Sequence, residues 1–198
     1  MPLWGASDSD ESKPKNLTTA QKKQVFANAS GWVLEAGSAL SGNDNTDADP
    51  EVLVAIGDLS TSIGAADITE VEMVTTTADK SEGFTISVRV RYNEPVNVVT
   101  TGGTPTLAVT NSNAGSGSGR GPHSLSYASG SGTNELIFSL AIAAANAATN
   151  ADDVLSVGAQ TIALNSGTMK DASGTASDAA RVISGALGTA AGTVTVTA

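Results

Sequence analysis

Residues 84–92 alternate without interruption between apolar and polar side chains, and this constrains the fold more than any other stretch. The apolar members are Phe84, Ile86, Val88, Val90 and Tyr92. Successive side chains leave opposite faces of a pleated strand, so the pattern predicts a β-strand with one buried face. Pro95 follows and has no N–H to donate to a ladder, which predicts that the strand ends or becomes a sheet edge there.

Further strand-like runs, separated by Gly, Asn, Asp or Pro, continue to the C-terminus. Together they predict strands at residues 69–75, 84–92, 104–110, 124–128, 135–142, 154–157, 160–164, 181–183 and 193–197. This spacing favours an antiparallel β-sandwich over a βαβ arrangement. The apolar residues at alternate positions from 136 to 142 share a face, and we expect them to meet the apolar face of residues 84–90 across the core.

The chain before this domain, which we place at residues 67–198, begins with a polar segment. Residues 1–17 are charged and contain prolines, and Leu3 and Trp4 are their large apolar side chains. A segment of this composition cannot bury enough surface to fold alone. It predicts either an extended arm that becomes ordered on contact with a partner, or a disordered terminus.

Residues 18–66 predict a small α/β adaptor module between the arm and the sandwich. Thr18 and Gln21 have the spacing of a capping box, which predicts a helix from about Ala20 to Asn28. Two apolar runs predict strands, at residues 31–34 and 51–56. The segment holds too little core to be stable alone, so we expect it to pack on the C-terminal domain, on a second copy or on a partner.

The formal net charge of −10 opposes binding to nucleic acid or to an anionic membrane, because both require clustered Lys and Arg. Residues 1–30 are the least acidic part, which favours their contact with an acidic surface. Cysteine is absent, and this favours assembly under reducing conditions. The sequence starts without a secretory signal pattern and has no apolar run that could span a bilayer, so we expect synthesis in the cytoplasm.

The glycine-rich segment 115–121 and the single histidine, His123, are the first candidates for chemistry. The segment reads GSGSGRG and lacks the residues of a Walker loop and the spacing of a dinucleotide loop, so we interpret it as a flexible connection. A Ser–His nucleophile would need His123 beside a serine and a carboxylate. Its position after Pro122, where a predicted strand begins, favours an exposed or capping role, and a typical zinc site would need more ligands.

Two acidic clusters carry the ligand type that Ca²⁺ prefers. Residues 43–49 (NDNTDAD) form one, and Asp152, Asp153 and Asp171 would form the other if they converge at one end of the sandwich. The first lacks the spaced glycine and the terminal Glu of an EF-hand. We interpret both as solvated acidic loops, with calcium binding as the alternative.

The candidates for contact with a partner are Leu3, Trp4, Lys13, Lys15 and Trp32. Trp is enriched among interface anchors, so Trp4 predicts either a docking anchor or a side chain folded back on its own chain. The two lysines favour a groove with an acidic rim. Trp32 lies inside an apolar run, which indicates a local core residue more readily than a contact.

The order of motifs from residue 84 onward resembles a bacterial immunoglobulin-like repeat. The matching residues are Phe84, Val88, Glu94, Pro95, Val96, Pro105, Leu107, Tyr127, Gly130, Gly132, Leu136 and Phe138, followed by LNSGTMKDASGTAS at 164–177. The opening MPLWG, the Lys-Pro-Lys around residue 14, and GWV with the later EVLVAIG resemble the start of small virion structural proteins of marine tailed phages, particularly those of cyanobacteria. Neither resemblance supplies a catalytic residue.

These resemblances imply an immunoglobulin-like antiparallel sandwich in a non-enzymatic capsid decoration (cement) protein. Its partner would be the major capsid protein, with other copies of this chain as a second partner, and no cofactor, nucleic acid or membrane is expected. Its location would be the exterior of the virion capsid, after synthesis in the host cytoplasm. The alternatives are a neck, tail or fibre-associated virion protein, and an adhesive surface-binding module. A polysaccharide-degrading enzyme is disfavoured, because no paired carboxylates stand out at strand positions.

Overall fold

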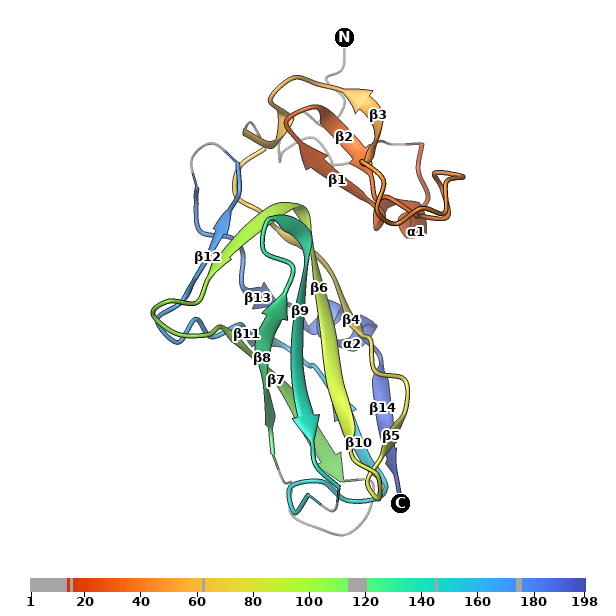
Figure 1. Cartoon of the computed structure of the whole chain (residues 1–198), viewed down its shortest axis with the longest axis vertical. Coiled ribbons are helices and arrows are strands. Elements are labelled where there is room, and N and C mark those ends of the chain that lie inside the picture. Colours follow the sequence, from red (N-terminus) through yellow and green to blue (C-terminus); the bar gives the residue numbers. More distant parts are fainter. Residues whose placement is uncertain (1–13, 15, 62, 114–120, 145, 174–175) are drawn as a thin grey trace.

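A computed structural model of the chain describes residues 14, 16–61, 63–113, 121–144, 146–173 and 176–198. These residues confirm the prediction of a mainly β protein with multi-strand antiparallel sheets arranged as a sandwich. The molecule is elongated: a small three-stranded sheet occupies one end, and the C-terminus lies at the other end of the sandwich (Figure 1).

The strands of the sandwich form one continuous hydrogen-bonded path, in the order β12-β6-β9-β8-β7-β10-β14-β5, with β4 paired to β6 off this path. Their bounds are β4 (Ile68–Met73), β5 (Ala78–Asp79), β6 (Phe84–Val99), β7 (Thr106–Asn113), β8 (His123–Ser129), β9 (Thr133–Ile142), β10 (Asp153–Ser156), β12 (Thr168–Asp171) and β14 (Thr193–Thr197). Strands β11 (Gln160–Thr161) and β13 (Val182–Ile183) pair with each other, and helix α2 (Gly185–Ala190) follows them. The sequence patterns did not predict β5, β12 or α2.

Strand β6 is longer than the alternating pattern predicts, because it continues past Pro95. Residues 84–91 pair with β9, and the register then shifts after Arg91. Pro95 lies inside this irregular stretch, where its missing N–H costs no ladder bond, and its carbonyl accepts a hydrogen bond from Ala172 N at 2.9 Å. Beyond it, Val96–Val99 pair with β12. The prediction that the strand ends or becomes an edge at Pro95 is therefore wrong.

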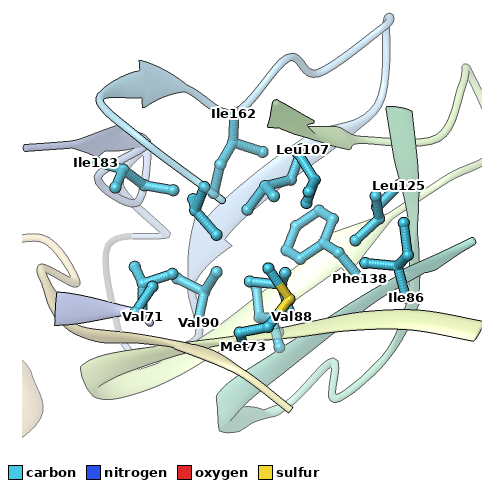
Figure 2. Packing of buried hydrophobic residues seen from close by; sticks show 14 of the residues in the cluster. Val71, Met73, Ile86, Val88, Val90, Leu107, Leu125, Phe138, Ile162 and Ile183 are labelled. Atoms are coloured by element: carbon cyan, nitrogen blue, oxygen red, sulfur yellow. The ribbon is translucent and has the colours of Figure 1, made fainter. Parts of the chain in front are cut away.

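The apolar faces of β6 and β9 lie side by side in the sheet, since Val88 pairs with Phe138 and Val90 pairs with Leu136. Our expectation that these two runs meet across the core is therefore wrong. Both runs face the aliphatic side chains of the opposite layer. Figure 2 shows the Phe138 ring inside this core, pointing toward Leu107 of β7.

The small module comprises α1 (Thr19–Lys22), β1 (Val25–Asn28), β2 (Gly31–Leu34), β3 (Glu51–Ala55) and the 3-10 helix η1 (Leu59–Thr61). The predicted capping box is present, because Gln21 N donates to Thr18 Oγ1 at 3.3 Å and Thr18 N donates to Gln21 Oε1 at 2.9 Å. The helix nevertheless ends at Lys22, so the predicted helix over residues 20–28 is wrong beyond that point. The next residues instead form β1, which pairs with β2 in an antiparallel hairpin.

Burial on both faces of this hairpin explains why β1 is a strand. One face belongs to a separate apolar core, formed by Val25, Ala27, Trp32, Leu34, Leu59 and Ile63. The other face carries the cross-strand pair Phe26–Val33, which is buried but lies outside that core. This second face is turned toward the sandwich, because β1 packs against β6.

Candidate functional site

A partly buried ionic network joins the small module to the sandwich. Arg91 of β6 lies at its centre, and 13% of its side chain is exposed. Its Nη1 lies 2.9 Å from Glu70 of β4, its Nη2 lies 3.4 Å from Glu35, and its Nε binds Glu135 of β9. Glu35 directly follows β2, whereas Glu70 and Glu135 belong to the sandwich. One guanidinium therefore ties the two parts together.

Neighbouring side chains extend this network on both sides of the junction. Asn134 Nδ2 donates to Glu35 Oε1 at 2.8 Å, which adds a second link between the module and β9. Lys23 of the module pairs with Glu70 of the sandwich. Arg89 pairs with two sandwich carboxylates, including Glu135 at 3.5 Å. The alternating pattern correctly predicts a polar outer face for β6, but nothing in it indicates that the module covers this face.

Burial and charge oppose each other at this junction. Burial raises the pKa of the Glu35 carboxyl above its usual value; the hydrogen bond from Asn134 and the charge of Arg91 act against this rise. Burial alone would lower the pKa of the Arg91 guanidinium, but the nearby Glu35, Glu135 and Glu70 carboxylates outweigh it, and the pKa is raised. The guanidinium is thus a permanent charge that holds a partly desolvated group of carboxylates together.

A cleft of about 740 Å³ opens beside the network, between the module and the sandwich. Gln24 and Phe26 contribute to its module wall, the loop after Glu35 contributes a second wall, and Arg89 and Asn134 contribute to its sandwich wall. This volume lies within the range of about 300–1,000 Å³ that is usual for small-molecule sites. The cleft is therefore large enough to hold a polar ligand of a few rings.

Among the contact candidates, Leu3, Trp4, Lys13 and Lys15 lie outside the described residues. Trp32 is 0% exposed and belongs to the core of the small module. This position fits the interpretation of Trp32 as a local core residue. It does not fit a direct contact with a partner, because the side chain does not reach the surface.

His123 begins β8, as predicted, but it is neither exposed nor a cap. It is 6% exposed, and its Nε2 lies 3.1 Å from Oγ1 of Thr149, which is fully buried. Burial lowers the pKa of His123, and the nearby Asp153 carboxylate opposes this. A hydroxyl, an imidazole and a carboxylate thus come together, but the hydroxyl is sealed from solvent. We interpret the group as a buried polar network that orients the 143–153 connection.

The acidic clusters differ from the expected arrangement. Asp153 lies on β10 and Asp171 on β12, strands that are not neighbours in the sheet, so the expected convergence of these carboxylates is wrong. The loop 43–49 is largely exposed, and the amides of Asn45 and Asp47 bond to Asn43 and Asn45 side chains in local turns. Among the described residues, no three potential ligands come together in a metal-binding group. The glycine segment lies outside the described residues except for position 121.

No helix in the described part of the chain is long and apolar enough to cross a membrane. Comparison of the chain with protein-family models, with curated proteins and with solved structures finds no match.

Proposed function

We propose that the chain is a non-enzymatic structural protein of a tailed-phage virion, a decoration (cement) protein that binds the lattice of the major capsid protein. The observation that carries this proposal is a continuous mechanical connection. It runs from the point where the N-terminal arm joins the module, through the module core, to the sandwich. A segment that grips a partner at the arm would thereby hold the whole molecule on the particle.

The first link is the anchoring of the arm. Pro14 is buried, Leu17 N donates to the Pro14 carbonyl at 3.4 Å, and Leu17 packs against the module core. These residues fix the chain directly after the segment that contains Leu3 and Trp4. A load on the arm would be passed to the apolar core of the module.

The second link is the junction between the module and the sandwich. Arg91 contacts carboxylates from both parts, and β1, which carries the buried Phe26, packs against β6. An ionic network and apolar contacts together resist displacement of the module better than either alone. The sandwich would therefore be held in a fixed orientation on the capsid.

The chemistry of the arm supplies the contact itself. Trp4 would bury a large apolar surface on assembly, and Lys13 and Lys15 would pair with an acidic rim on the capsid protein. An added interface of this kind between neighbouring subunits resists expansion of the capsid under the pressure of packaged DNA.

Sedimentation with capsids that lack the protein tests the proposal. The full chain should bind, deletion of residues 1–13 should abolish most binding, and Trp4→Ala should reproduce much of that loss. Lys13→Ala with Lys15→Ala should weaken binding and reduce its salt dependence, because exposed charges are screened by salt. Lys80 lies on the sandwich directly after β5, and Lys80→Ala is the matched control. This variant should bind capsids like the full chain.

Two outcomes contradict the proposal in different ways. Full binding by the chain without residues 1–13 would move the contact to the module or the sandwich. No binding by the intact chain would favour a neck, tail or fibre-associated protein, or an adhesive module. The cleft at the junction is the observation that favours the adhesive alternative.

A further inference from the structure

The walls of the junction cleft are charge-balanced. Arg89, Arg91, Glu35 and Glu135 are the charged residues among the described side chains that line it. Each guanidinium is already held by carboxylates, Arg89 by Glu72 and Glu135, and Arg91 by Glu135 and others. An anion or a cation in the cleft would have to compete with these existing pairs. A neutral polar ligand would not.

Planar polar groups in the walls are held in fixed positions. Asn134 is 6% exposed and donates to Glu35, so both groups keep one orientation. Arg89 is held in the same way by its carboxylate partners. A ligand hydroxyl can donate to a carboxylate or amide oxygen and accept from a guanidinium or amide N–H at the same time. Neighbouring hydroxyls on a rigid ring therefore match such fixed groups without a large loss of side-chain entropy.

The module side of the cleft offers both apolar surface and unmet hydrogen bonds. Phe26 and Pro50 line it and would contact the C–H face of a ring. Gln24 Oε1 and Ser38 Oγ are buried and have no hydrogen-bond partner in the described part of the chain. Both residues line the cleft, so these polar atoms lie beside the space that a ligand would fill. The ligand would then complete bonds that the protein leaves unmade.

We propose that this cleft is a binding site for a neutral saccharide. The ring hydroxyls would bond to Glu35, Asn134 and Arg89, and the apolar ring face would lie against the module wall. The described residues that line the site belong to the module and the sandwich, so binding of a saccharide is tested without any measurement of capsid attachment. It would give the assembled protein a second surface, directed at a carbohydrate.

Titration of the ¹⁵N-labelled full chain with maltose, cellobiose and lactose tests this site. At least one of the three should shift the backbone amides of residues 35–38 and 132–135, and the amides of β10 and β14 should stay unchanged. Glucuronic acid and glucosamine, which are charged, should bind about tenfold more weakly or worse than the preferred neutral sugar. A tenfold difference corresponds to about 1.4 kcal/mol.

Two variants distinguish binding at this site from nonspecific binding of sugars to the protein surface. Gln24→Leu combined with Ser38→Ala should weaken sugar binding about tenfold, or about 1.4 kcal/mol. The double variant should not lower the thermal midpoint of unfolding, because both changes remove buried polar atoms that have no hydrogen-bond partner. Ser112→Ala, on the distant strand β7, should bind like the parent chain. The proposal is overturned if none of the three neutral sugars shifts the cleft amides. It is equally overturned if a charged sugar binds as tightly, or if the double variant binds unchanged.

Discussion

Replacement of Arg91 by Met should weaken the attachment of the small module to the sandwich. The expected loss of stability is larger than that caused by removing an exposed ion pair. Met keeps the apolar length of the side chain but leaves Glu35, Glu70 and Glu135 close together without their shared cation. Removal of one partner from a buried ion pair costs about 3–5 kcal/mol. The carboxylate side chains here are 14–27% exposed, so we expect the lower end, about 3 kcal/mol.

Urea unfolding followed by Trp fluorescence measures this loss. In a Trp4→Phe background, Trp32 is the remaining tryptophan and reports on the module core. With a denaturant slope of about 2 kcal/mol per molar urea, a loss of about 3 kcal/mol lowers the midpoint by about 1.5 M. The loss should shrink as the pH falls, because burial raises the pKa of Glu35 and protonation of this carboxyl removes part of the repulsion that Met leaves behind.

Two further variants test whether the loss comes from the ionic network at the junction. Lys170→Met breaks the exposed pair with Asp178 and should leave the Trp32 midpoint unchanged. Glu35→Gln keeps the acceptor for Asn134 and removes a carboxylate whose pKa burial already raises, so it should change stability by less than about 1 kcal/mol. Equal effects of Arg91→Met and Lys170→Met would show that the network does not hold the module in place.

Phe138→Ala should lower the free energy of unfolding by about 3–5 kcal/mol, measured by urea unfolding followed by circular dichroism. Ser139→Ala, on the opposite face of β9, should have little effect. Comparable losses would mean that the faces of β9 are misassigned. Burial lowers the pKa of His123 below its unfolded value of about 6.5, so the unfolded chain binds the extra proton first and stability should fall as the pH drops through this region. His123→Gln should flatten this fall below about pH 6.5, the unfolded pKa, and an unchanged slope would exclude His123 as its source. Gly31→Ala should destabilise the module by about 1–3 kcal/mol in the Trp32 fluorescence assay. Gly31 has φ +132°, and a Cβ there would lie 2.0 Å from the Val54 carbonyl oxygen. A Cβ at Gly57 meets open space, so Gly57→Ala should be tolerated.

The sequence predicts the sandwich strands well where burial differs between the two faces of a strand. β6 and β9 follow period-2 alternation closely, and β2 and β14 have the predicted bounds. Prediction fails for β1, because both faces are buried and Val25–Asn28 shows no alternation of polarity. The capping box at Thr18 is correct, but it fixes only where a helix begins. The hairpin with β2 then determines where it ends.

The candidate site is less predictable, because it depends on which surfaces meet. Arg89 and Arg91 have the pattern of a solvated strand face, and Glu35 has that of a loop carboxylate. Nothing local to these residues indicates that a separate module covers the strand and closes a cleft above it. His123 shows the same limit, since its burial depends on Thr149 from a connection that is distant in the sequence. Strand patterns report on one face at a time, whereas contacts between folded parts depend on tertiary packing.

The polar character of the junction has a consequence for how the two parts assemble. The apolar pair Phe26–Val33 could slide along a flat sheet face, because apolar contact has little directional preference. A guanidinium with carboxylates on three sides has one arrangement that satisfies its planar donors, so Arg91 sets the position of Glu35 and with it the orientation of the module. The same residues form a wall of the cleft. The geometry of the cleft and the orientation of the module on the sandwich are therefore fixed by the same ionic contacts.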